Sequence, residues 1–118
     1  MNRITGDRLI AAIQKTGLKP TRSLTHGGDC ACPIMICAIA DGYEYGGGPR
    51  GELENAARLL GLKGGYLSKL ISGIDGHLIL LSTQFLIPSD QFEAAVQDAA
   101  DIKVKLAEAN ITFLVRGR

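Results

Sequence analysis

The densest group of reactive side chains lies between residues 26 and 37, in the segment HGGDCACPIMIC. It contains His26, Cys30, Cys32 and Cys37, and four nitrogen and sulfur ligands are what a closed tetrahedral zinc site requires. Structural zinc sites, however, usually take their ligands from two short knuckles separated by a longer span, whereas here all four would come from one short segment. We therefore expect neither a metal nor another cofactor, although metal binding remains an alternative to a structural role.

The same residues define the one enzymatic hypothesis that the sequence offers. Cys30 or Cys32 lies next to the start of an apolar helix expected from about Pro33, where the helix dipole would stabilise a thiolate. His26 would then act as the base. No acid, oxyanion donor or substrate motif accompanies these residues. A thiol-dependent enzyme is therefore the alternative, and a non-enzymatic role is favoured.

Composition predicts a single domain over residues 1–118. With 46% hydrophobic residues the chain can bury a real core, and with 5% aromatics and no Trp that core suits closely packed helices. The net charge of +1 argues against a surface that attracts nucleic acid everywhere. Basic residues nevertheless outnumber acidic ones in segments 1–25 and 50–73, which would allow a shared basic face.

Localisation is inferred from what the sequence lacks. The uncharged runs 30–40 and 76–89 are too short or too interrupted by polar residues to cross a bilayer, which takes about 20 apolar residues. Charged residues break up the N-terminal segment, so no signal core is expected. Three cysteines close together do not form the paired framework of a secreted domain. We expect a cytoplasmic protein without a membrane partner.

Capping residues and apolar spacing predict several helices. Thr5 can cap a first helix that ends at Gly17, Lys19-Pro20 prevents its continuation, and the following segment 21–29 is expected to be a loop. The last helix should start at Ser89 and run to about Ala109. Its expected apolar stripe consists of Phe92, Val96, Ala99, Ile102 and Leu106, and further helices are expected over about 32–40, 53–60 and 64–72.

A small β component is expected near the C-terminus. Segment 77–87 is compatible with strands or with a buried helix, and segment 111–115 reads as a strand that could pair with residues 78–81. A two-stranded sheet is marginal alone, so completion by a second subunit, and hence a homodimer, is worth considering. The predicted fold is mainly α, with α+β as an alternative: a compact helical domain with a short C-terminal β component.

Segment 53–73, LENAARLLGLKGGYLSKLISG, predicts two helices joined by a tight turn. Ala57 is small where the helices would cross, Gly61 can adopt the positive φ of the turn, and Leu67 fills the angle between the helices. The spacing of these three residues resembles the helix-turn-helix of the phage-repressor and Cro-like family. There is a fainter likeness to small uncharacterised proteins of phages and mobile elements.

The helix-turn-helix resemblance implies that the second helix contacts DNA. Gly64 and Gly65 leave its start without base-reading side chains, so contact with phosphates is favoured over sequence readout. The residues assigned to this contact are Arg58, Lys63, Ser68, Lys69 and Ser72. Taken together, the sequence predicts a small non-enzymatic binding or assembly protein, homodimeric, with DNA as a possible partner.

Overall fold

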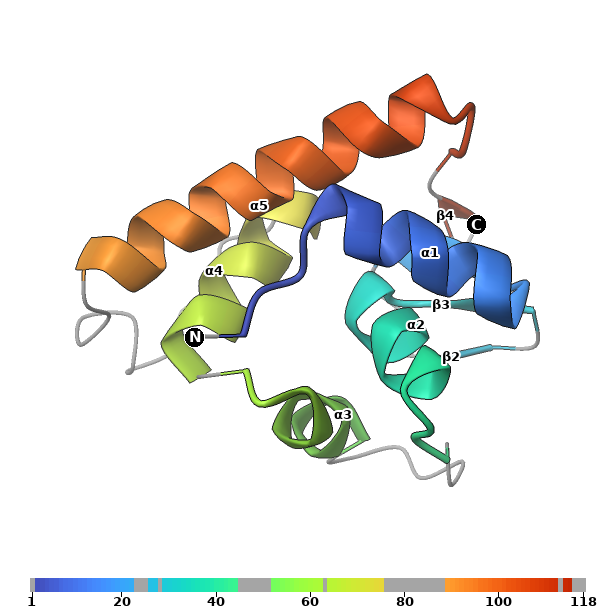
Figure 1. Cartoon of the computed structure of the whole chain (residues 1–118), viewed down its shortest axis with the longest axis horizontal. Coiled ribbons are helices and arrows are strands. Elements are labelled where there is room, and N and C mark those ends of the chain that lie inside the picture. The colour runs from blue at the N-terminus through green and yellow to red at the C-terminus, as the bar shows by residue number, and fades with distance from the viewer. Residues whose placement is uncertain are drawn as a thin grey trace.

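The computed structural model describes residues 2–22, 26–27, 29–44, 52–62, 64–75, 89–112 and 114–115. These residues form helices and a small sheet, which confirms a mainly α fold with a small β component (Figure 1). In chain order the elements are α1 (Gly6–Thr16), β1 (Lys19–Arg22), β2 (His26–Gly27), β3 (Cys30–Ala31), α2 (Pro33–Ala40), α3 (Glu52–Leu60), α4 (Gly64–Asp75), α5 (Ser89–Glu108) and β4 (Leu114–Val115).

The long helix α5 crosses both α1 and α4 along one side of the molecule (Figure 1). Helix α2 packs against α1, and α3 packs against α2. The helices enclose one hydrophobic core. Its largest fully buried apolar side chains are Tyr66, Ile4, Leu9, Ile34, Met35, Ile36, Leu70, Ile74 and Ile102.

The first two helices begin and end where the sequence predicts. The Thr5 side chain accepts a hydrogen bond from the Arg8 backbone N–H (3.2 Å), and Gly17 ends α1 with a φ of 72°. Pro33 opens α2 without loss of a helical hydrogen bond, because a first-turn N–H has no partner within the helix. Residues 33–38 of α2 are all buried, as expected for an apolar central helix.

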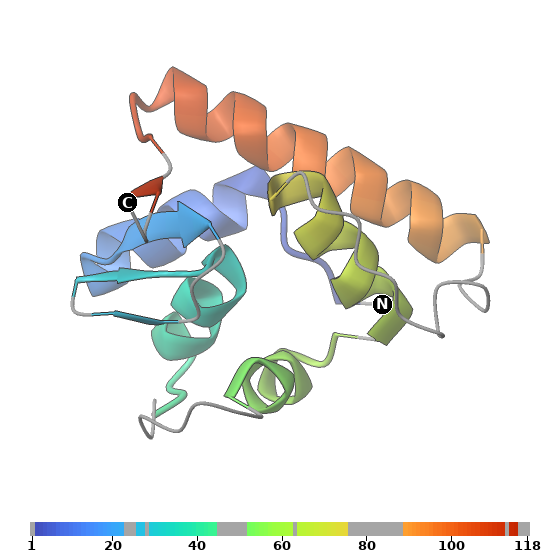
Figure 2. The ribbon, with the colours of Figure 1, turned by 180° about the vertical axis from the view of Figure 1, so that it is seen from behind.

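The sheet corrects the prediction of a loop over residues 21–29, because Thr21 and Arg22 belong to β1 and His26 and Gly27 form β2. Strand β1 lies in the middle of the order β2-β3-β1-β4 and pairs in parallel with both β3 and β4. The strands lie beside α1 and α2, at the end of the molecule away from α4 (Figure 2). Short strands gain stability when they pack against helices. The residue types of these strands alone do not indicate that packing.

Strand β4 pairs with β1, a partner that the sequence did not indicate. Thr21 is in register with Leu114, and Arg22 with Val115. Residues 78–81 lie outside the described residues, as does the choice between strand and helix for 77–87. Because β4 pairs within its own chain, the sheet gives no reason to require a second subunit.

A buried polar network fixes the N-terminal segment to α4 and α5. Asp98 on α5 is only 2% exposed, and its carboxylate accepts hydrogen bonds from Arg3 Nε (2.9 Å) and Nη2 (2.8 Å). The Tyr66 hydroxyl on α4 donates to the same carboxylate and accepts from the Ile4 backbone N–H (2.9 Å). The burial of Asp98 therefore sets which face of α5 points inward.

Candidate functional site

The backbone distributes the cluster of cysteines and His26 over β2, β3 and α2. Cys30 is buried in β3, and Cys32 is half-buried at the N-cap of α2. The antiparallel register places His26 opposite Ala31, so neither cysteine is its cross-strand neighbour. The His26 side chain lies outside the described part of the structure. Within that part, no group of three or more His, Cys, Asp or Glu residues is placed to hold a metal ion.

Cys37 lies in the wall of a cavity of about 180 Å³ between α1 and α2. Burial raises the pKa of the Cys37 thiol from 9.0 to about 12, although nearby Arg8 acts in the opposite direction. A thiol with such a pKa stays neutral at physiological pH and is a poor nucleophile. The cavity is lined by Arg8, Ala11, Ala12, Lys15, Cys37, Ala40 and Asp41.

The corner between α3 and α4 has the predicted turn. Gly61 adopts a φ of 72° directly after α3, and the Leu62 N–H donates to the Ala57 carbonyl oxygen (2.9 Å). Beyond this turn, however, the two helices pack mainly on different partners: α3 on α2, and α4 on α5. The corner between α3 and α4 therefore connects two packed regions of the core, one formed by α2 and α3 and the other by α4 and α5.

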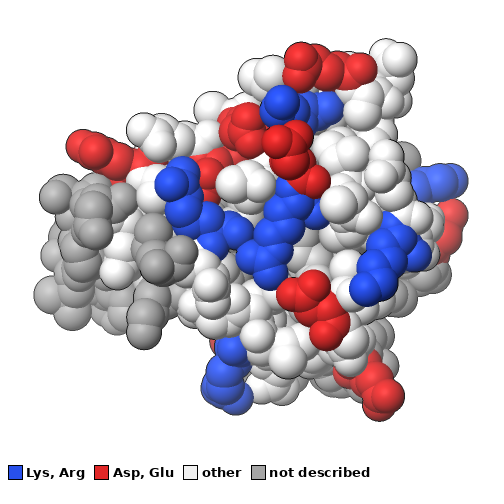
Figure 3. All heavy atoms as spheres, in the orientation of Figure 1, with Lys and Arg blue, Asp and Glu red and all other residues white. Residues whose placement is uncertain are grey.

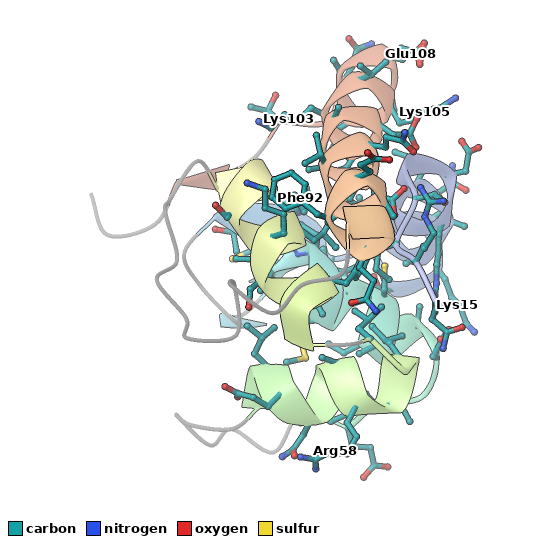
Figure 4. All side chains as sticks on the ribbon, turned by 90° about the vertical axis from the view of Figure 1, so that its left-hand side faces the viewer. Lys15, Arg58, Phe92, Lys103, Lys105 and Glu108 are labelled. Atoms are coloured by element: carbon teal, nitrogen blue, oxygen red, sulfur yellow. The ribbon has the colours of Figure 1, made fainter. Side chains whose placement is uncertain are left out.

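The four described residues assigned to DNA contact do not share one exposed face. Ser68 is 3% exposed, so the expectation that it projects from α4 is wrong: that side of α4 packs into the core. Lys69 Nζ lies 4.5 Å from the centre of the Phe92 ring, and Ser72 is half-buried. Arg58 is exposed and projects from α3 on the side away from Phe92 (Figure 4). Lys63 lies outside the described residues.

The charged surface is mixed in sign. On the face drawn in Figure 3, basic and acidic side chains alternate, with no broad field of either sign. Several charged side chains of the described residues form ion pairs: Arg8 with Asp41 (3.1 Å), Lys19 with Asp29 (3.4 Å) and Lys105 with Asp7 (3.7 Å). These local pairs lower the potential that a polyanion would meet on approach.

The most distinctive surface belongs to α5. Its inner side is buried against α1 and α4 through Ala95, Asp98, Ala99, Ile102 and Leu106. Its outer side carries large apolar residues that remain exposed: Phe92 at 43%, Val96 at 45% and Val104 at 55%. With Ala100, which is also exposed, they form what we call the outer stripe: Phe92, Val96, Ala100 and Val104.

The outer stripe corrects the predicted core face of this helix. Phe92 and Val96 were expected to be buried with Ala99, but the buried side of α5 is centred near Ile102. On an ideal helix Phe92 lies about 80° and Val96 about 120° around the axis from Ile102, which places Phe92 at the edge of the buried side and Val96 beyond it. Asp98 takes the inward position because Arg3 and Tyr66 satisfy its charge.

No known protein family, characterised protein or solved structure matches this chain. The geometry of the chain itself therefore carries the functional argument. The described helices include none with the length and apolarity to span a membrane.

The outer stripe was not predicted, although the sequence contains a signal for it. Phe92, Val96, Ala100 and Val104 recur every four residues, while Ala95, Ala99, Ile102 and Leu106 form a second apolar series on the same helix. A helix needs one apolar side to pack on a single core, so the second apolar side of α5 is not required for the core. The unused side is a candidate contact surface.

Proposed function

We propose that the protein is a non-enzymatic assembly protein and that the outer stripe of α5 is its docking surface. The observation that carries this proposal is the exposure of Phe92, Val96 and Val104 along the outer side of a helix whose inner side is buried. Single exposed apolar residues are ordinary on protein surfaces, but contiguous groups commonly mark contact sites.

Phe92 has the properties of an interface anchor. Aromatic side chains supply a large contact area at a small cost in conformational entropy. Lys69 lies over its ring at 4.5 Å, a cation–π contact that orients the ring while leaving it 43% exposed. A partner that covers the stripe would remove these apolar side chains from water, at about 25 cal/mol for each Å² buried.

The test compares the size of the chain with and without the stripe. A tagged chain in extracts of the cells that naturally produce it should elute as a particle larger than the 12.5 kDa chain. The double substitution Val96→Glu and Val104→Glu should return it to monomer size with an unchanged melting temperature, because both positions are exposed. Gln14→Glu, at an exposed position on α1, is the matched control. Equal sizes for wild type and double variant would reject the proposal.

DNA contact at the α3–α4 corner is the second candidate. It is favoured by Arg58, which is exposed in the last turn of α3, close to the Gly61 turn. The contact would be with phosphates and therefore depend on salt. Duplex DNA should bind at about 50 mM salt and weaken when Arg58, Lys63 and Lys69 become Glu; no binding under these conditions would remove this candidate.

A further inference from the structure

We infer that the partner of the outer stripe is a second copy of this chain, with the two α5 helices packed antiparallel. The inference rests on the proposed docking role of α5 and adds the identity and orientation of the partner. Two observations carry it: the distribution of apolar residues along the stripe, and the two charged residues that flank it.

The apolar residues are arranged symmetrically about the level of Asp98. Val96 and Ala100 lie two residues on either side of this level, and Phe92 and Val104 lie six residues on either side. Reversing the helix therefore places Phe92 of one copy at the height of Val104 of the other, and Val96 at the height of Ala100. A surface that matches its own reversed image is what a two-fold symmetric interface requires.

The flanking charges select the antiparallel orientation. Glu93 and Lys103 lie five residues on either side of Asp98 and are both exposed. Among the described residues, neither takes part in an ion pair. In an antiparallel pair each Glu93 is level with Lys103 of the other copy, which gives two attractive contacts. A parallel pair in the same register would instead oppose two glutamates and two lysines, which is unfavourable.

The side-chain sizes also fit a helix pair. Ala100 is small and lies near the centre, where it permits the two helices to approach closely. The larger Phe92 lies toward the ends of the contact, where the helices diverge if they cross at an angle. Figure 4 shows Lys103 on the same side of α5 as Phe92, whereas Lys105 points toward α1. Lys103 is therefore placed to reach a partner on the stripe.

The first experiment measures the mass of the purified chain by sedimentation at concentrations up to about 0.5 mM. The wild type should approach twice 12.5 kDa. Val96→Glu should weaken dimerisation at least about tenfold, because it places a charge at the centre of the contact. Gln14→Glu should leave dimerisation unchanged. A wild type that stays monomeric throughout would overturn the inference.

The second experiment tests the orientation by zero-length carbodiimide coupling, which joins a carboxylate to an amine in direct contact. Within one chain Glu93 and Lys103 are separated by about 15 Å of helix, so they cannot be coupled to each other. A Glu93–Lys103 link, identified by mass spectrometry in the dimer fraction, must therefore join two copies. A dimer without this link would overturn the antiparallel arrangement.

Charge exchange gives an independent check. Glu93→Lys or Lys103→Glu alone should weaken the dimer several-fold at low salt, and the two together in one chain should restore it. Failure of the exchanged chain to recover would count against the Glu93–Lys103 contact. If the purified chain is monomeric while the tagged chain in its native extract still loses size on substitution of Val96 and Val104, the docking role survives and only the self-association is rejected.

Discussion

The Tyr66 hydroxyl donates a 2.5 Å hydrogen bond to the Asp98 carboxylate, joining α4 to α5 inside the core. The same hydroxyl accepts a hydrogen bond from the Ile4 backbone N–H, and Arg3 donates to both oxygens of the carboxylate. Burial and the hydrogen bond to Asp98 raise the pKa of Tyr66, so its hydroxyl stays protonated and can donate. One fully buried tyrosine thus positions the N-terminal segment and the inner side of α5 together.

Tyr66→Phe should lower the free energy of unfolding by about 1–3 kcal/mol, because the buried Ile4 N–H loses its acceptor while the ring volume is retained. Urea unfolding followed by circular dichroism measures the loss. Arg58→Ala, at an exposed position, is the control and should change stability by less than about 0.5 kcal/mol. A Tyr66→Phe variant as stable as this control would show that the hydroxyl contributes little.

Gly73 lies where α4 packs closely against α5. A Cβ atom at this position would lie 2.7 Å from the Cβ of Ala99. Glycine to alanine inside a helix ordinarily stabilises by about 0.5–1 kcal/mol, but here overpacking should reverse the sign and cost about 1–3 kcal/mol.

The companion variant for Gly73→Ala is Ala99→Gly. The double variant should be more stable than the sum of the two single effects predicts, since removing the Ala99 methyl group makes room for the new one. Thermal unfolding of all four proteins provides the cycle. If the effects of the two single substitutions are additive, the methyl group added at position 73 does not clash with the Ala99 methyl group.

The sequence predicted the helices well because their signals are local. Thr5 and Gly17 bound α1 through caps that need only neighbouring residues, and Ser89 marks the start of α5. The strand expected over residues 111–115 is present as β4, but β1 was not predicted because it is stabilised by partners distant in sequence, such as Leu114. The outer stripe was not predicted for a related reason. Which side of α5 faces inward depends on the contact of Asp98 with Arg3 and Tyr66, which are distant in sequence.

The turn after α3 offers a matched pair of glycines. Gly61 and Gly17 both have a φ of 72°, so alanine at either position should cost about 1–2 kcal/mol in backbone strain. At Gly61 a new Cβ would also collide with the Asn2 amide, which donates to the Leu60 carbonyl oxygen (2.9 Å), whereas nothing lies near Gly17. Gly61→Ala should therefore be the more destabilising, by about 0.5–1.5 kcal/mol.

An Asn2→Ala background tests the origin of that difference. Without the Asn2 amide, Gly61→Ala and Gly17→Ala should have nearly equal costs in chemical denaturation. A difference that persists in this background would assign the extra cost of Gly61→Ala to the turn itself.

Cys37 should make the protein sensitive to alkali. Because its pKa is raised from 9.0 to about 12 in the folded state, its contribution to stability is complete below about pH 9 and is lost as the pH rises toward 12. Over this range each pH unit should lower the free energy of unfolding by up to about 1.4 kcal/mol for this thiol. Urea midpoints at about pH 8 and about pH 10.5 measure the loss.

The matched variant is Cys37→Ala. It should cost about 1 kcal/mol at pH 8 through the lost side-chain volume, yet lose less stability than the wild type between pH 8 and pH 10.5. Some alkaline loss should remain, because the pKa of Tyr66 is raised as well and acts with the same sign. If wild type and variant lose equal stability between pH 8 and pH 10.5, the pKa of Cys37 is not raised by folding. The Cys37 thiol would then have to be reconsidered as a reactive group.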